Sequence, residues 1–109
     1  MKKTTLILSL LFIVSVFSCK KETVETVEAC FTLTKVGFEV NEVIRFNNCS
    51  SGAERYLWDF NDGTTTETAY PEHTYTKAGM YSVVLTAYGE KTQKTYTTVI
   101  YITEKPTGK

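Results

Sequence analysis

The chain has 109 residues, which is enough for one domain of modest size. Its 12 Lys and Arg residues balance its 12 Asp and Glu residues. A net charge of zero provides no basic surface of the kind that binds nucleic acid, so we expect no nucleic-acid partner. Aromatic residues make up 13% of the chain, and Tyr and Thr recur in its second half, which favours β-strands.

Residues 1–18 have the composition of a secretory signal peptide. Two lysines follow Met1, and residues 6–17 are apolar except for Ser9 and Ser15. A basic start before an apolar run of about a dozen residues is typical of an export signal, and the run is too short to span a membrane as a mature helix. A buried N-terminal helix is the alternative, but no polar stripe interrupts the run.

The four residues Val16-Phe-Ser-Cys19 directly follow the apolar run and resemble the lipobox of bacterial lipoproteins. The resemblance implies cleavage before Cys19 and lipidation of this cysteine, which would anchor the chain firmly to a membrane. Lys20 rather than Asp follows the cysteine, and by the sorting tendency of that family the resemblance implies the outer membrane or the cell surface within the cell envelope. Ordinary secretion with an unmodified Cys19 is the alternative.

The rest of the chain divides into a tether, a domain and a tail. Residues 19–28 are mostly polar and charged and are typical of a flexible tether. The domain is expected to cover residues 29–103, and residues 104–109 are expected to form a frayed tail. Alternating apolar and polar residues between turn residues predict seven short strands and no helix, which indicates an all-β sandwich. These strands are expected at 30–35, 43–47, 56–60, 65–68, 73–75, 80–88 and 93–103.

The same alternation predicts which side chains form the core. Trp58 is the single tryptophan, and it shares one face of its strand with Tyr56 and Phe60. On the other strands, the side chains expected to face inward are Ile44, Phe46, Tyr81, Val83, Leu85, Ala87, Tyr96, Thr98, Ile100 and Ile102.

A tight turn is predicted where the Trp58 strand ends, at Asn61, Asp62 and Gly63. These residue types tolerate the left-handed backbone that such turns require. Asp59 is expected to accept backbone N–H bonds from this turn. The spacing superficially matches an EF-hand loop, but Gly63 occupies the fifth position and Tyr70 occupies the twelfth, which excludes an EF-hand.

Two cysteines, Cys30 and Cys49, lie at the start of the first expected strand and just after the second. If these strands run antiparallel, the two cysteines are neighbours. Since an oxidising compartment permits disulfide bonds, we predict a disulfide between Cys30 and Cys49. Two free thiols are the alternative. A metal pair is disfavoured because the chain has one histidine and no Cys-x-x-Cys motif.

Three ordered motifs resemble those of the PKD domain: Trp58-Asp-Phe-Asn-Asp-Gly63, Pro71-x-His73-Thr-Tyr75 and Gly79-x-Tyr81-x-Val83-x-Leu85. The resemblance covers roughly residues 29–103. It implies an immunoglobulin-like, seven-stranded antiparallel β-sandwich with the tryptophan at its centre.

Two positions in these motifs, Asn61 and Tyr81, allow specific structural expectations. The family usually has Gly where this chain has Asn61, but Asn also tolerates a positive φ, so the turn should survive. Tyr81 has the spacing of a tyrosine corner, in which the hydroxyl bonds back to nearby backbone.

The sequence predicts no enzyme. His73 is the only histidine, and it lies in a motif that the PKD family keeps for structure. The resemblance implies a non-catalytic module that binds envelope proteins or extracellular glycans. An accessory binding or spacer subunit of an extracellular polysaccharide- or protein-degrading system is the alternative. No cofactor is expected, although calcium stays open because some family members bind it through oxygen ligands at domain edges.

Three tyrosines are candidates for a ligand-binding surface. Tyr88 and Tyr101 are expected to face outward on the last two strands, and Tyr70 is expected in a loop. Tyrosine combines a flat apolar face with a polar tip, which suits contact with a glycan or a protein. The alternative is that these are ordinary outward-facing strand residues.

Overall fold

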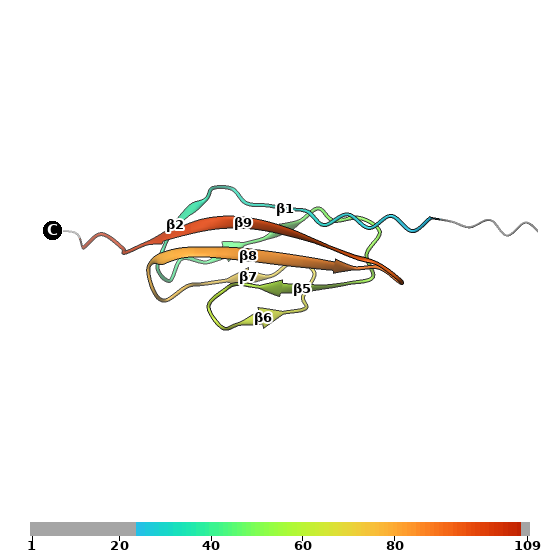
Figure 1. Ribbon diagram of the computed structural model, residues 1–109. Coiled ribbons are helices and arrows are strands. Elements are labelled where there is room, and N and C mark those ends of the chain that lie inside the picture. Colours follow the sequence, from blue (N-terminus) through green and yellow to red (C-terminus); the bar gives the residue numbers. More distant parts are fainter. Residues whose placement is uncertain (1–23, 108–109) are drawn as a thin grey trace, which may run out of the picture.

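The chain forms an all-β sandwich, as the sequence predicts (Figure 1). A computed structural model describes residues 24–107, so the expected signal peptide, Cys19 and the start of the tether lie outside the described residues. Within residues 24–107, no helix is long and apolar enough to cross a bilayer. The strands in this range are β1 (Phe31–Thr32), β2 (Gly37–Glu39), β3 (Ile44–Arg45), β4 (Asn47–Asn48), β5 (Arg55–Asp59), β6 (Thr65–Thr66), β7 (Glu72–His73), β8 (Gly79–Tyr88) and β9 (Gln93–Thr103).

One layer of the sandwich is a five-stranded sheet in the order β2-β9-β8-β5-β6. Its centre is the long β8–β9 hairpin, and β5 pairs antiparallel with β8 so that Trp58 lies opposite Leu85. The strands of this sheet pair antiparallel except that β2 runs parallel to β9. The parallel pair arises because β2 enters from the opposite layer rather than through a hairpin.

Two short antiparallel pairs, β1-β4 and β3-β7, form the opposite layer. The single strand expected at 43–47 is therefore two strands with different partners. The break falls at Phe46, whose side chain is buried and whose backbone N–H donates to the carbonyl oxygen of Pro71 at 3.0 Å. Alternation predicted the inward Ile44 and Phe46 correctly, but it carries no information about a change of partner.

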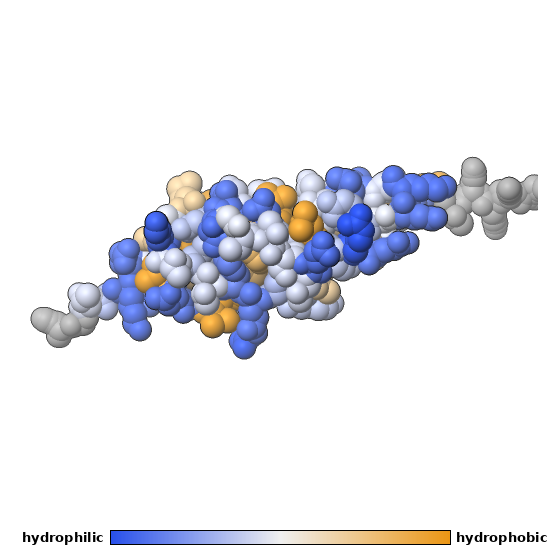
Figure 2. All heavy atoms as spheres, turned by 90° about the horizontal axis from the view of Figure 1, so that it is seen from below, coloured by the Kyte–Doolittle hydropathy of each residue, from blue (hydrophilic) through white to orange (hydrophobic). Residues whose placement is uncertain are grey.

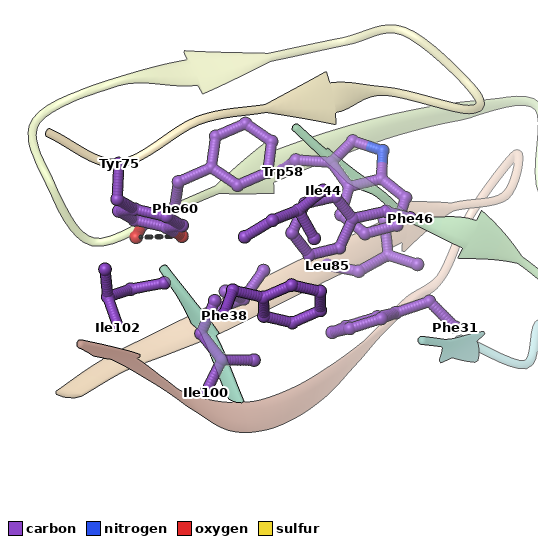
Figure 3. Packing of buried hydrophobic residues seen from close by; sticks show 11 residues of the cluster. Phe31, Phe38, Ile44, Phe46, Trp58, Phe60, Tyr75, Leu85, Ile100 and Ile102 are labelled. Atoms are coloured by element: carbon purple, nitrogen blue, oxygen red, sulfur yellow. Dashed lines mark hydrogen bonds between the residues drawn. The ribbon is translucent and has the colours of Figure 1, made fainter. Parts of the chain in front are cut away.

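Trp58 lies at the centre of the core with none of its surface exposed (Figure 3). Its ring lies 5.1 Å from the ring of Phe31 and 5.5 Å from that of Phe46, both in the opposite layer. Aromatic contacts at these separations add to the apolar area that the rings bury. The other buried members of this cluster are Phe38, Ile44, Phe60, Tyr75, Val83, Leu85, Ile100 and Ile102.

Tyr81 and Tyr96 lie at the margin of the core and differ in how their side chains are held. Tyr81 packs against the core, and its hydroxyl donates to the carbonyl oxygen of Lys77 at 2.8 Å, as a tyrosine corner requires. Tyr96, which the sequence predicts to face inward, is 41% exposed. Its ring nevertheless faces inward, as expected, and lies nearly perpendicular to the ring of Phe31 with centroids 5.3 Å apart.

The predicted disulfide joins Cys30 and Cys49, whose Cα atoms are 4.9 Å apart. The two cysteines flank the β1–β4 pair, in which Phe31 lies opposite Asn48. The Cys49 N–H also donates to the carbonyl oxygen of Cys30 at 2.9 Å. The antiparallel pairing assumed from the sequence is thus the reason that the thiols meet.

The domain begins earlier than the expected boundary at residue 29. Val27 is only 2% exposed, and Glu28 exchanges two backbone hydrogen bonds with Ser51, at 2.9 and 3.0 Å. The polar and charged segment around Val27 shows no strand alternation, so the sequence predicts it to be part of the tether. The segment leaves the sandwich at the end opposite to the C-terminus (Figure 1).

The N-terminal segment also packs against the tip of the β8–β9 hairpin. A Glu25 carboxylate oxygen accepts a hydrogen bond from the backbone N–H of Lys91 at 2.9 Å. A Cβ atom at Gly89 would lie 2.5 Å from the Val27 side chain and would also collide with the Glu25 carboxylate. Glycine at this position therefore allows the segment to approach the hairpin closely.

Replacing Trp58 by Ala should lower the free energy of unfolding by about 3–5 kcal/mol, because it removes the central ring and leaves a cavity. Trp58→Phe should cost less, since it keeps an aromatic ring in the core. Urea unfolding followed by circular dichroism measures both changes. A Trp58→Ala protein as stable as the wild type would contradict the central role of this ring.

Replacing Cys30 and Cys49 together by Ser should lower the free energy of unfolding by about 3 kcal/mol, because the unfolded chain loses a cross-link closing a loop of this length. The wild-type protein under reducing conditions should show the same loss. Urea midpoints with and without reductant test this, and the double variant should be insensitive to the reductant.

Candidate functional site

The acidic turn after β5 is built by hydrogen bonds within the chain. An Asp59 carboxylate oxygen accepts from the backbone N–H of Asn61 at 2.9 Å, and the Phe60 N–H donates to the carbonyl oxygen of Thr64 at 3.2 Å. Asn61 has φ 67° and Gly63 has φ 92°. Asn61 thus adopts the left-handed conformation that glycine adopts most easily, so the substitution relative to the family pattern preserves the turn.

Asp62 connects this turn to β7. One of its carboxylate oxygens accepts from both the backbone N–H and the hydroxyl of Thr64, at 3.1 and 2.6 Å. The other lies 2.7 Å from Nε2 of His73. Burial of Asp62 opposes its ionisation, but the hydrogen bonds from Thr64 and His73 outweigh this effect and lower the pKa of the carboxyl group.

His73 is held by aromatic rings on both sides. Its imidazole stacks on the ring of Phe60 with centroids 4.1 Å apart and planes inclined by 6°. The ring of Tyr75 meets the imidazole edge-on at 4.7 Å. The Tyr75 hydroxyl in turn donates to the carbonyl oxygen of Phe60 at 2.9 Å (Figure 3), and burial raises its pKa. The only histidine of the chain therefore connects the turn to the core.

The Asp62, His73 and Thr64 side chains have the residue types of a catalytic triad but not its geometry. In a triad the carboxylate binds one imidazole nitrogen and the nucleophile binds the other. Here the carboxylate and the threonine hydroxyl both approach Nε2, at 2.7 and 3.5 Å. With both groups at Nε2, the carboxylate cannot orient the ring through Nδ1 while Nε2 takes the hydroxyl proton, as a triad requires. No three His, Cys, Asp or Glu side chains within residues 24–107 form a group that could hold a metal ion.

The three candidate tyrosines do not form one surface. Tyr88 and Tyr101 both lie on the outer face of the five-stranded sheet. Tyr101 is opposite Met80 and Tyr88 is opposite Gln93, so eight residues of β8, about 26 Å, separate the two positions. Figure 2 shows one face of the molecule, on which hydrophobic residues form small separate spots among hydrophilic ones.

Each of the two sheet tyrosines has a local partner. The Arg55 guanidinium lies over the ring of Tyr88, 4.0 Å from its centroid, and partly covers it. Tyr101 is about half exposed beside Met80.

Tyr70 lies in the opposite layer, in the loop before β7, and is 66% exposed. It borders an open groove of about 260 Å³. The groove is lined by Arg45, Phe46, Asn47, Tyr70, Pro71 and Glu72. Tyr70 therefore has space beside its ring for a ligand.

Sequence reasoning missed the two charged residues of this groove. The Nε of Arg45 donates to a carboxylate oxygen of Glu72 at 2.8 Å, across the β3–β7 pair. The two residues are far apart in the chain, and each belongs to a strand of two residues. Such short strands have no detectable periodicity, so no sequence signal indicated that these residues meet.

Comparison with known families agrees with this architecture. The family model for the PKD domain matches residues 32–103, about two thirds of the chain. The chain belongs to the PKD domain family. The resemblance seen in the sequence motifs is thereby confirmed, and so is the immunoglobulin-like sandwich that it implies.

Similar regions occur within bacterial proteases. The chain is 40% identical over 63 residues to the pre-pro-metalloprotease PrtV of Vibrio cholerae and 44% identical over 52 residues to the collagenase ColA of Bacillus cereus. These matches cover 58% and 43% of this chain, but only 7% and 5% of the proteases. The chain is thus similar to one small part of each enzyme.

Solved structures give the same result. The PKD1 domain of PrtV is 36% identical to this chain with a TM-score of 0.59, and the match covers 69% of this chain and 94% of that domain. A carbohydrate-binding module of a β-sandwich superfamily matches with a TM-score of 0.68 at 24% identity, over 72% of this chain and 34% of that chain. At this low identity, the second likeness shows the shared fold alone.

Replacing Asp62 by Asn should destabilise the protein near neutral pH and much less in acid. Because the pKa of Asp62 is lowered on folding, the unfolded chain binds the proton more tightly. The stabilisation from this carboxylate is therefore present above its ordinary pKa of about 3.9 and is lost as pH falls through the folded value. Urea unfolding of wild type and variant at about pH 5.5 and about pH 2.5 measures the difference.

The exposed Glu67→Gln variant is the matched control, since it removes a carboxylate outside the turn. It should follow the wild type at both pH values. A deficit of Asp62→Asn that is equal at both pH values would contradict the proposed role of its ionised form.

Proposed function

We propose that this chain is a non-catalytic, lipid-anchored PKD module of the bacterial cell envelope that binds proteins or glycans outside the cell. The observation that carries the non-catalytic part is the position of His73. The only histidine is stacked on Phe60 and bonded to Asp62 through the one ring nitrogen that Thr64 also approaches. Acid–base chemistry at this site would disrupt the turn that these residues build.

The envelope location is supported by the sequence before the domain. A basic start, an apolar run and Val16-Phe-Ser-Cys19 occur in the order of a lipoprotein signal. Among the described residues, which begin at Val24, the first with a hydrogen bond to the domain is Glu25, five residues beyond Lys20. An anchor on Cys19 would thus hold the hairpin end of the sandwich within about 20 Å of the membrane surface.

A second candidate role is an accessory binding or spacer subunit of an extracellular protein- or polysaccharide-degrading system. The observation that favours it is the occurrence of similar domains in a pre-pro-metalloprotease and a collagenase. In this role the module would hold a separate enzyme near its substrate. The two roles share the anchor and differ in whether the bound partner is an enzyme.

The anchor is tested by expressing the full chain in a bacterial host and separating membrane from soluble fractions. The wild type should remain with the membrane and enter the detergent phase, whereas Cys19→Ser should be soluble, because it lacks the acylated thiol. The Cys30→Ser/Cys49→Ser double variant keeps Cys19 and should remain with the membrane. Release of the wild type into the soluble fraction would disprove the anchor.

A further inference from the structure

The groove beside Tyr70 has the features of a small binding site. We propose that it is a saccharide-binding subsite in which the Tyr70 ring stacks on one sugar ring of a neutral β-linked glycan. This inference rests on the proposed function and names the ligand class and the residues that contact it. It depends on three properties of the groove: its size, the rigidity of the loop that carries Tyr70 and the polar groups at its edge.

The size of the groove favours a ligand of one ring. Its volume is about 260 Å³, slightly below the roughly 300–1,000 Å³ typical of sites for small molecules. A stable protein interface would instead bury roughly 800 Å² on each partner around an apolar centre. Beside Tyr70, the only apolar residues that line the groove are Phe46 and Pro71, and the exposed side chains of Arg45 and Glu72 border it, so it offers no apolar centre of that size.

The loop that carries Tyr70 is fixed to the core on its N-terminal side. The indole Nε1–H of Trp58 donates to the carbonyl oxygen of Thr68 at 2.9 Å. The side-chain amide of the buried Asn48 donates to the carbonyl oxygen of Ala69, also at 2.9 Å. The backbone immediately before Tyr70 is thus held by two residues that belong to the interior.

The loop is also fixed on its C-terminal side. The Phe46 N–H donates to the carbonyl oxygen of Pro71 at 3.0 Å, and Arg45 pairs with Glu72 in the β3–β7 ladder. An exposed aromatic ring on a rigid backbone loses little conformational entropy when a ligand binds. Tyr70 is therefore preorganised as a flat platform, although its own side chain is largely exposed.

The groove edge provides hydrogen-bonding groups for the rim of a sugar. Arg45 and Glu72 form an ion pair at 2.8 Å, and their side chains are 79% and 54% exposed. This contact uses one of the five guanidinium N–H donors and one carboxylate oxygen. The remaining donors and acceptors can bond to hydroxyl groups, and the balanced charge favours a neutral ligand over an anionic one.

A pyranose ring with equatorial substituents matches both parts of this surface. Its C–H face is apolar and packs on an aromatic ring, while its hydroxyl groups project from the edge and need donors and acceptors. β-Linked glucose and N-acetylglucosamine chains present such rings repeatedly. A short peptide could use the aromatic ring but would leave the charged groups at the rim without matched partners.

The test measures binding of cellohexaose and chitohexaose to the full chain, purified in a detergent without a sugar headgroup. Isothermal titration gives the dissociation constant, and saturation-transfer NMR identifies the sugar protons that touch the protein. At least one of the two oligosaccharides should bind the wild type, with transfer strongest at the C–H protons of one ring face. Failure of both to bind would overturn the proposal.

Four variants separate the groove from the rest of the surface. Tyr70→Ala should weaken binding at least tenfold, whereas Tyr70→Phe, which keeps the ring, should stay within about threefold of the wild type. Arg45→Gln should weaken binding by a smaller factor. Tyr101→Ala removes an exposed tyrosine on the other layer and should leave binding unchanged. Wild-type affinity in Tyr70→Ala, with an unchanged melting temperature, would overturn the proposal.

Failure of the saccharide subsite can be distinguished from failure of the proposed envelope function. If the wild type fractionates with the membrane and captures an envelope protein but neither oligosaccharide, the module function holds and the saccharide subsite is wrong. If the saccharide binds while Cys19→Ser and wild type fractionate alike, the subsite holds and the anchor is wrong.

Discussion

The structure depends on the packing of Trp58 between the two layers. Its ring contacts Phe31 and Phe46 across the core, and its indole N–H donates to the carbonyl oxygen of Thr68 in the loop before β7. One side chain therefore joins the five-stranded sheet to the short β1-β4 and β3-β7 pairs and also positions a surface loop. A smaller apolar residue could fill part of the space, but it could not hold the loop, because it has no donor.

The turn after β5 uses acidic residues for architecture rather than for chemistry. The Asp59 and Asp62 carboxylates accept hydrogen bonds from within the turn, and His73 is enclosed by Phe60 and Tyr75. A carboxylate that accepts several hydrogen bonds is stabilised in its ionised form and is a poor general acid near neutral pH. The cluster thus stabilises the turn. Its residue types alone would suggest a catalytic site, but their geometry does not.

Sequence alone predicts the parts of this fold whose signals are local or periodic. Alternation placed Trp58 and Leu85 in the core, and the strand order brought Cys30 to Cys49. The sequence does not predict that Arg45 meets Glu72, because strands of two residues are too short to show an apolar–polar alternation. Their pairing is set by the packing of the two layers. The same reason explains why Val27 was assigned to the tether: burial of one residue depends on its neighbours in space.

Hydrogen bonds from core residues hold the backbone on both sides of Tyr70. A variant can therefore lose binding although the replaced residue does not contact the ligand. Removing the Trp58 indole would release the carbonyl oxygen of Thr68, and removing the Asn48 amide would release that of Ala69. Either change would let the Tyr70 loop move, although neither side chain lines the groove. Removing the Tyr70 ring deletes the platform and leaves these bonds in place. Contact and support are therefore separated by stability: a contact variant loses affinity at constant melting temperature, and a support variant loses both.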